Sequence, residues 1–281
     1  MDAAQAWSLF WKEQGHESRC LALSPDFCER LDAHWHAFAS GLADGARVID
    51  LGCGSGAVGR ALRSAAPGLR VTGVDVAHIA PSNDPGLELI ANVAMESLPF
   101  EDGAFAAAVS QFGYEYAAAP AAAAEELARV VAPGGSLSFL VHHTDGPIIG
   151  AMRRHRRAIE GLCGAEMKSA FLSGDRPTLG SRIEQLRREC ANDSLVETAG
   201  RALQAQLGND EAVRARVWNA IVEALAPELA MLRSLDLSVE GGRTIDGVMK
   251  PLRASFALEP PRPLRSADDE PIAWIIEGSR L

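Results

Sequence analysis

The stretch that decides the fold reads Arg47-Val48-Ile49-Asp50-Leu51-Gly52-Cys53-Gly54-Ser55-Gly56-Ala57-Val58-Gly59-Arg60. Its apolar start predicts a buried strand, its three alternate glycines predict a tight turn, and a helix follows. Glycine lets the backbone turn sharply and leaves no Cβ between the backbone and a ligand. The helix then presents N–H groups that have no partner inside it. Asp50, at the end of the strand, offers a carboxylate to a cationic or hydroxylated ligand.

The segment from Asp50 to Gly56 resembles the first motif of class I S-adenosylmethionine-dependent methyltransferases. In that family the glycine turn passes the methionine part of the cofactor. The run from Gly54 to Gly59 also fits the G-x-G-x-x-G fingerprint of dinucleotide-binding proteins, with Asp75 at a suitable distance. The turn by itself therefore leaves a nicotinamide-dependent oxidoreductase open.

The next strand is expected over residues 69–75 and ends at Asp75. The resemblance implies that this carboxylate accepts hydrogen bonds from both ribose hydroxyls, with Val76 beside it. Residues 76–86 contain Pro81, Asn83, Pro85 and Gly86. These residues predict a loop or a shortened helix where the family has a full helix.

A second signature follows a short strand expected over residues 87–92. Residues 95–105, Met-Glu-Ser-Leu-Pro-Phe-Glu-Asp-Gly-Ala-Phe, resemble the methyltransferase loop that flanks the adenine. Ala94 stands where the family usually has an aspartate, so Met95 is expected to pack against the ring and Glu96 to be a possible acceptor. A dehydrogenase has no reason to carry this loop, so the two signatures together favour the methyltransferase.

Two further strands, expected over residues 105–112 and 136–141, should end beside the pocket, because ligands of doubly wound sheets bind beyond the carboxyl ends of strands. The first end supplies Gln111 and Phe112 as cofactor candidates, followed by Tyr114 and Glu115. The second ends in His142-His143, which strand alternation sends to opposite faces. Imidazole is the usual general base near neutral pH. Aromatic packing and a structural histidine remain equal alternatives.

Cofactor candidates are Asp50, Gly52, Cys53, Gly54, Gly56, Asp75, Val76, Met95, Glu96, Gln111 and Phe112. Catalytic candidates are His142, His143, Glu115 and Tyr114.

The N-terminal region predicts helices over residues 3–14 and 25–41, the second with Ser24 as N-cap and Pro25 in its first position. Trp7, Phe10 and Trp11 lie on one side of the first helix. They could close over a cofactor, although docking on the core is the favoured interpretation of each. In His34-Trp35-His36 the imidazoles diverge, because helix residues two apart face different directions, so no metal site is predicted.

Residues 147–250 are mostly helical by pattern, with helices expected over 147–162, 178–191, 193–207, 209–233 and 241–251. The run Arg153-Arg154-His155-Arg156-Arg157 predicts a solvated helix face, with an acidic substrate as the minor alternative. Residues 255–258 and 271–277 return to the sheet, and Pro260, Pro261 and Pro263 separate them. A helix over 120–131 and the turn Ala132-Pro133-Gly134-Gly135 precede the fifth strand.

The composition is ordinary for a soluble globular protein, with 47% hydrophobic and 23% charged residues among 281. The net charge of -10 argues against a general nucleic-acid binder. Five scattered cysteines without a C-x-x-C pair suggest neither disulfides nor zinc, which favours a cytoplasmic location. No signal peptide or membrane-spanning stretch is apparent.

Together these features predict a doubly wound, mostly parallel, seven-stranded α/β sheet of the Rossmann-like type. Residues 1–45 would cover the pocket, 46–145 bind the cofactor, 146–252 form a helical substrate lid, and 253–281 complete the sheet. The resemblance implies methyl transfer from S-adenosylmethionine to a small-molecule acceptor, with oxygen or nitrogen favoured over carbon or sulfur. Gln111-Phe112-Gly113-Tyr114 stands where base and glutamine N-methyltransferases carry Asn/Asp-Pro-Pro-Tyr/Phe. Alternatives are an NAD(P)-dependent oxidoreductase and a cofactor-binding protein without methyl-transfer activity; a monomer or a homodimer is open.

Overall fold

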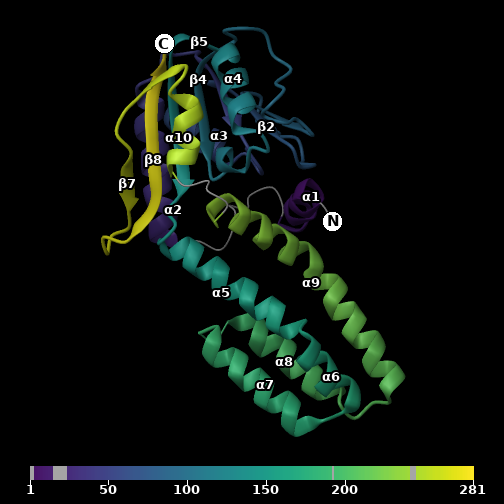
Figure 1. The fold of residues 1–281 in the computed structure, drawn as a ribbon. Coiled ribbons are helices and arrows are strands. Elements are labelled where there is room, and N and C mark those ends of the chain that lie inside the picture. Colours follow the sequence, from purple (N-terminus) through teal and green to yellow (C-terminus); the bar gives the residue numbers. More distant parts are fainter. Residues whose placement is uncertain (1–2, 15–23, 192, 241–244) are drawn as a thin grey trace. The chain divides into compact units, whose positions relative to one another are not determined.

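The computed structural model describes residues 3–14, 24–191, 193–240 and 245–281. The chain divides into two compact units, which Figure 1 shows in the colours of the sequence. The sheet unit comprises residues 2–148 and 234–281, and the helical unit comprises residues 149–233.

The sheet unit is built on eight strands in the order β3-β2-β1-β4-β5-β8-β6, with β7 also paired to β8. The strands are β1 Arg47–Leu51, β2 Arg70–Asp75, β3 Leu87–Ala91, β4 Phe105–Gln111, β5 Val131–His142, β6 Phe256–Leu258, β7 Arg262–Arg265 and β8 Pro271–Arg280. The first five are parallel and β8 runs antiparallel to β5. This confirms the predicted doubly wound sheet. The eighth strand arises because Pro260 and Pro261, which lack N–H donors, separate β6 from β7 along the same partner strand.

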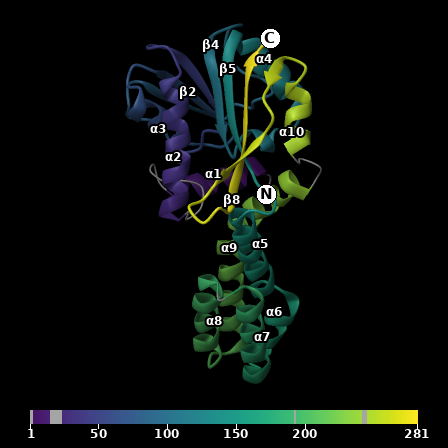
Figure 2. The ribbon, with the colours of Figure 1, turned by 90° about the vertical axis from the view of Figure 1, so that its left-hand side faces the viewer.

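Helices cover both faces of this sheet. They are α1 Ala3–Gln14, α2 Pro25–Ser40, α3 Ala57–Ala65, the 3-10 turn η1 Tyr114–Tyr116, α4 Pro120–Val130 and α10 Ile245–Leu252. Figure 2 shows α2 and α3 on one face and α4 and α10 on the other. Ser24 caps α2 as expected, because its side chain accepts from the N–H of Phe27. Residues 241–244 of the last predicted helix lie outside the described residues.

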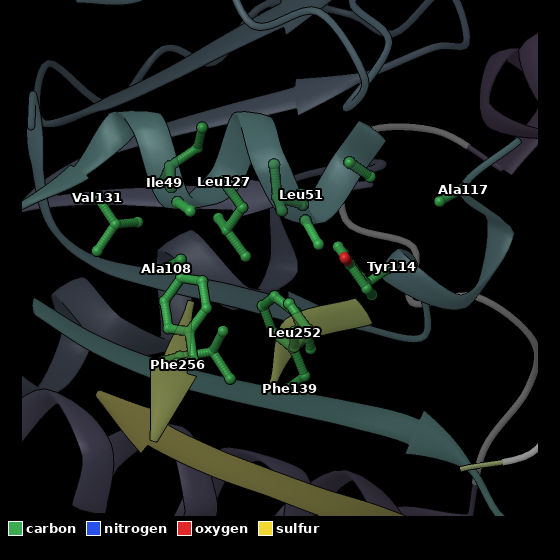
Figure 3. Packing of buried hydrophobic residues seen from close by; sticks show 14 of the residues in the cluster. Ile49, Leu51, Ala108, Tyr114, Ala117, Leu127, Val131, Phe139, Leu252 and Phe256 are labelled. Carbon is green, nitrogen blue, oxygen red and sulfur yellow. The ribbon is translucent and has the colours of Figure 1, made fainter. Parts of the chain in front are cut away.

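One large core cluster fixes the sheet against α4 and α10 (Figure 3). Ile49, Leu51 and Phe139 come from the central strands and are fully buried. They pack with Leu127 of α4 and Leu252 of α10. Burying a side chain of this size contributes about 1.5–3 kcal/mol. The face of the sheet that α4 and α10 cover therefore holds the main hydrophobic core of the sheet unit.

Two local features matter for the prediction. Residues 76–86 form no helix, as expected, and Ala77 and Ile79 from this loop are buried instead. The fifth strand was expected to begin at Ser136, after a turn at residues 132–135. This boundary is wrong, because β5 already begins at Val131. The register between β4 and β5 shifts between Phe105, which pairs with Val131, and Ala107, which pairs with Ser136. Residues 132–135 therefore form an irregularity within the strand.

The helical unit contains parts of five helices: α5 Pro147–Leu162, α6 Ala165–Ser173, α7 Arg176–Glu189, α8 Ser194–Gln206 and α9 Glu211–Glu240. The short α6, which begins directly after Gly164, was not predicted. Phe171, Leu179 and Trp218 lie in the apolar core of this unit. No helix among the described residues has the length and apolarity that crossing a membrane would require.

One ionic cluster ties three parts of the helical unit together. His155 of α5 lies 2.8 Å from a carboxylate oxygen of Asp193 and 3.1 Å from one of Glu228. The hydrogen bond to Glu228, followed by that to Asp193, raises the pKa of His155 to about 9. The central residue of the arginine-rich run is therefore a structural contact.

Candidate cofactor pocket

A cavity of about 360 Å³ lies in the sheet unit at the carboxyl ends of β1, β2 and β4. Its walls come from α1, the glycine turn, the end of β2, residues 93–96, and residues 111–118. This volume is within the range of small-molecule sites. Its position is the one where doubly wound sheets bind their ligands.

The glycine turn is shaped by close packing. Gly52, Gly54 and Gly56 all have positive φ angles, of 67°, 50° and 82°. A Cβ on Gly52 would lie 2.8 Å from the Cα of Gly113, and one on Gly54 would lie 2.2 Å from the ring of Trp11. Glycine is required at these positions by both conformation and space. Gly54 and Gly56 therefore shape the turn but do not themselves line the cavity.

The N–H groups of this turn are used inside the protein. Those of Gly52 and Cys53 donate to the carbonyl of Val74, and that of Gly56 donates to the carbonyl of Cys53. The N–H of Gly54 donates to Asp75. These four donors are therefore not available to cradle a pyrophosphate group as the turn does in dinucleotide sites.

Asp50 is the most unusual group in the cavity wall. Its side chain is fully buried, and neither carboxylate oxygen has a hydrogen-bond partner among the described residues. Burial, and secondly the charge of Asp75, raises the pKa of Asp50 to about 8. An unpaired buried carboxylate is costly, and such groups cluster at functional sites. Asp50 is therefore placed to receive a cationic or hydrogen-bond-donating ligand group.

Asp75 lies at the end of β2 as predicted. Its two oxygens accept from the N–H groups of Gly54 and Ala77, each at 2.8 Å. Burial raises the pKa of this carboxyl, although both hydrogen bonds oppose that shift. A carboxylate has about four acceptor positions, so two remain for a ligand.

The charged side chains along the described cavity wall are all acidic. Asp50, Asp75 and Glu96 line it, and no lysine, arginine or histidine does. Aromatic rings complete the wall. The ring of Trp7 stacks on that of Trp11, with 6.3 Å between centroids, and meets that of Tyr116 edge-on, with 5.5 Å between centroids. Acidic groups and aromatic faces both attract cations.

The loop of the second signature also reaches the cavity. Val93, Ala94, Met95 and Glu96 line it. Glu96 accepts a hydrogen bond from the N–H of Ala119 at 3.0 Å, which ties this loop to the segment after β4. Val76, on the opposite rim, is half exposed. The remaining cofactor candidates, Gly52, Cys53, Gln111 and Phe112, line the cavity as well.

Two of the four catalytic candidates come together. His142 Nδ1 contacts the Glu115 carboxylate, which also accepts from the backbone N–H of His142 at 3.2 Å. The imidazole stacks on Phe112, with 4.2 Å between ring centroids. Phe112 lines the cavity, so this buried pair lies directly behind its wall.

The other two candidates point elsewhere. The ring of Tyr114 belongs to the core cluster (Figure 3), and its hydroxyl reaches the carbonyl of Pro120 at 3.5 Å. His143 stacks on Trp274 at 4.7 Å. Neither side chain lines the described cavity wall, and the same is true of His142 and Glu115. Of the four candidates, His142 is distinguished because it contacts a carboxylate and stacks on Phe112 of the wall, whereas Tyr114 packs in the core and His143 packs on Trp274.

The N-terminal aromatic side chains contribute more to the cavity than their sequence pattern predicts. Trp7 and Trp11 line the cavity, whereas docking on the core was the favoured interpretation of each. In the sequence these tryptophans appear only as part of the apolar side of the first helix. That pattern predicts burial of the helix side but does not show what the helix packs against. Ser55 and Tyr116 also line the cavity and were not among the candidates. The histidines around Trp35 diverge: His34 bonds to Ser138 at 2.9 Å, and His36 is exposed.

Residues 49–139 match the family model described as a methyltransferase domain. The matched segment includes the glycine turn, Asp75 and the loop of residues 95–105. A demethylmenaquinone methyltransferase of Thermus thermophilus is 40% identical over 101 residues, which are 34% of this chain and 46% of that protein. The match thus spans less than half of the Thermus protein.

Two further similarities cover more of the chain. An uncharacterized protein of Mycobacterium tuberculosis is 26% identical over 217 residues, covering 68% of this chain and 78% of that protein. An S-adenosylmethionine-dependent methyltransferase of Mesorhizobium loti superposes with a TM-score of 0.45 and 17% identity, covering 88% of this chain and 98% of that one. The sheet order and the two sequence signatures of residues 49–139 are those expected from the resemblance to class I S-adenosylmethionine-dependent methyltransferases.

Proposed function

We propose that this protein transfers a methyl group from S-adenosylmethionine to a small-molecule acceptor through an oxygen or nitrogen nucleophile. The observation that carries the proposal is the cavity at the glycine turn, which has an unpaired buried carboxylate, Asp50, and only acidic charged side chains. S-adenosylmethionine brings a sulfonium and an ammonium group to such a wall. Bound there, it supplies an already activated methyl group.

Each part of the cavity suits one part of this cofactor. Asp50 lies beside the glycine turn and suits the ammonium group, while Asp75 suits the ribose hydroxyls. Met95 and its neighbours provide an apolar wall for the adenine. The rings of Trp7 and Trp11 would exclude water above the turn.

The oxidoreductase alternative fits this cavity less well. A dinucleotide carries a doubly negative pyrophosphate, and no lysine, arginine or histidine lines the described cavity wall to pair with it. Four N–H groups of the turn, those of Gly52, Cys53, Gly54 and Gly56, already donate within the protein and are not available to hold the pyrophosphate. The same sequence fingerprint therefore supports a cationic cofactor here.

In this mechanism the main task of the protein is to hold the acceptor in line with the methyl group. The pair His142–Glu115 supports proton removal. Glu115 holds Nδ1, and Nε2 has no hydrogen-bond partner among the described residues. An imidazole oriented by a carboxylate is the usual form of a general base. His142 Nε2 would take the proton of the acceptor hydroxyl or ammonium, and Glu115 would stabilise the imidazolium.

The first test is calorimetric titration with S-adenosylhomocysteine and, in parallel, with NADH. We expect micromolar binding of S-adenosylhomocysteine only, and its loss in Asp75→Ala. Binding of NADH alone would overturn the proposal. Binding of S-adenosylhomocysteine without turnover on any acceptor tried would favour the non-catalytic alternative.

Once an acceptor is found, His142→Gln tests the base. We expect turnover to fall by about 10²-fold or more with unchanged S-adenosylhomocysteine affinity. His143→Gln, one residue along the same strand end, serves as the matched control and should retain activity. Equal activity in the two variants would remove His142 from the mechanism.

A further inference from the structure

The side chain of Gln111 is fixed by a tryptophan from a distant helix. Trp35 of α2 is 1% exposed, and its Nε1–H donates to Gln111 Oε1 at 2.7 Å. An indole N–H can only donate, so this contact defines which end of the amide is the oxygen. The NH₂ end of Gln111 is consequently turned away from Trp35.

That NH₂ group has no hydrogen-bond acceptor among the described residues, since the bond to Trp35 is the one described hydrogen bond of the Gln111 side chain. Gln111 lines the cavity. It therefore presents a donor with an unmet hydrogen bond to whatever occupies the cavity. Its neighbour Phe112 has a positive φ of 55°, so the chain turns immediately after this residue.

The sheet register places this donor close to Asp50. Asp50 pairs with Val109 across β1 and β4, and Gln111 lies two residues further along the same face. With a strand spacing of about 4.8 Å and a rise of about 3.3 Å per residue, the two Cα atoms are about 8 Å apart. An unpaired acceptor and an unpaired donor thus flank one end of the cavity, which is the pattern that complements a zwitterionic amino acid.

The support for Gln111 is rigid. The residue before Trp35, His34, bonds to Ser138 of the neighbouring strand β5 at 2.9 Å. The two rings also touch, with 4.7 Å between centroids. Helix α2 is therefore anchored to two adjacent strands at successive residues.

We infer that Trp35 is a positioning residue that holds the Gln111 amide with its NH₂ group toward the carboxylate of the amino-acid end of the cofactor. This inference rests on the proposed function. It makes the cavity selective for ligands that carry the α-amino acid over truncated nucleosides. Neither residue takes part in bond making.

The test measures dissociation constants for S-adenosylhomocysteine and for 5′-methylthioadenosine, which lacks the amino-acid end. We expect Trp35→Phe to raise the dissociation constant for S-adenosylhomocysteine by about tenfold, because the hydrogen bond from Gln111 to the ligand loses its fixed geometry. Methylthioadenosine should bind as in the wild type. Trp274→Phe, a tryptophan truncation in the same unit beside His143, is the matched control and should change neither ligand.

Two variants at Gln111 keep the test independent of the folding of Trp35→Phe. Gln111→Glu retains an acceptor for Trp35 and turns a second carboxylate oxygen toward the ligand carboxylate. We expect Gln111→Glu to weaken the binding of S-adenosylhomocysteine more than Gln111→Met does. In the double variant Trp35→Phe/Gln111→Met, the loss should equal that of Gln111→Met alone, because Trp35 acts through Gln111.

The outcomes separate the two proposals. If the wild type does not bind S-adenosylhomocysteine, the proposed function fails. If it binds but Trp35→Phe weakens both ligands equally, or the double variant loses the sum of both single effects, Trp35 is only structural and the inference is overturned. Unchanged affinity in Gln111→Glu would overturn it as well.

Discussion

The buried carboxylate of Asp50 makes the stability of the sheet unit depend on pH in a way that one substitution can isolate. The pKa of Asp50 is about 8 in the folded protein against an ordinary 3.8, because burial and the neighbouring Asp75 disfavour its charge. Between these pH values the folded state binds a proton that the unfolded chain has released. The free energy of unfolding therefore falls as pH rises from 4 to 8, and this contribution stays constant above that.

The magnitude follows from the shift. Each pH unit in this window removes about 1.4 kcal/mol, so the whole window amounts to on the order of 5 kcal/mol. In Asp50→Asn this contribution is absent, while the variant carries a pH-independent cost of about 1–3 kcal/mol for its buried amide. We expect the variant to be less stable than the wild type near pH 4 and more stable at pH 8.

The assay is urea unfolding followed by tryptophan fluorescence at several pH values. A Trp218→Phe background removes the tryptophan of the helical unit, so that the signal comes from Trp7, Trp11, Trp35 and Trp274 of the sheet unit. Subtracting the two stability curves cancels the titrating groups that do not interact with Asp50, including His34, whose pKa burial lowers to about 4. A difference that stays constant between pH 4 and 8 would refute the assignment of an unpaired, proton-bearing Asp50.

Three further outcomes are expected. Saturation with S-adenosylhomocysteine at pH 7 should release a proton from Asp50, which is detected as a dependence of the calorimetric enthalpy on buffer ionisation; Asp50→Asn should show none. Gly54→Ala should displace Trp11, which acrylamide quenching detects, and should lower the free energy of unfolding by about 1–2 kcal/mol from the positive φ alone, which thermal unfolding detects. Gly208→Ala, where a Cβ meets open space, is the control and should not affect quenching. His155 has a folded pKa raised to about 9, so its stabilisation of the helical unit should be complete below pH 6.5 and lost as pH rises through 9. Unfolding followed by Trp218 should show this decline, and an equally steep decline in His155→Asn would contradict it.

The sequence by itself determined the order of strands and helices around the cavity. Alternate glycines, proline positions and apolar periodicity are local signals, because turn chemistry and strand alternation depend on residues a few positions apart. They located the glycine turn, Asp75 at the end of β2, and the loop without a helix after it. The strand end predicted the cavity-lining positions of Gln111 and Phe112, and the family resemblance of residues 95–105 predicted that of Met95.

The tertiary structure alone decided which side chains meet. Trp35 is 76 residues from Gln111, and Glu115 is 27 residues from His142. Such pairings depend on how α2 and η1 pack on the sheet. The same packing turned Tyr114 into the core and left Asp50 without a hydrogen-bond partner among the described residues, although the sequence placed both at strand ends. A periodic pattern shows that a face is buried, but only the packed neighbours determine what that face contacts and whether a polar group on it is satisfied.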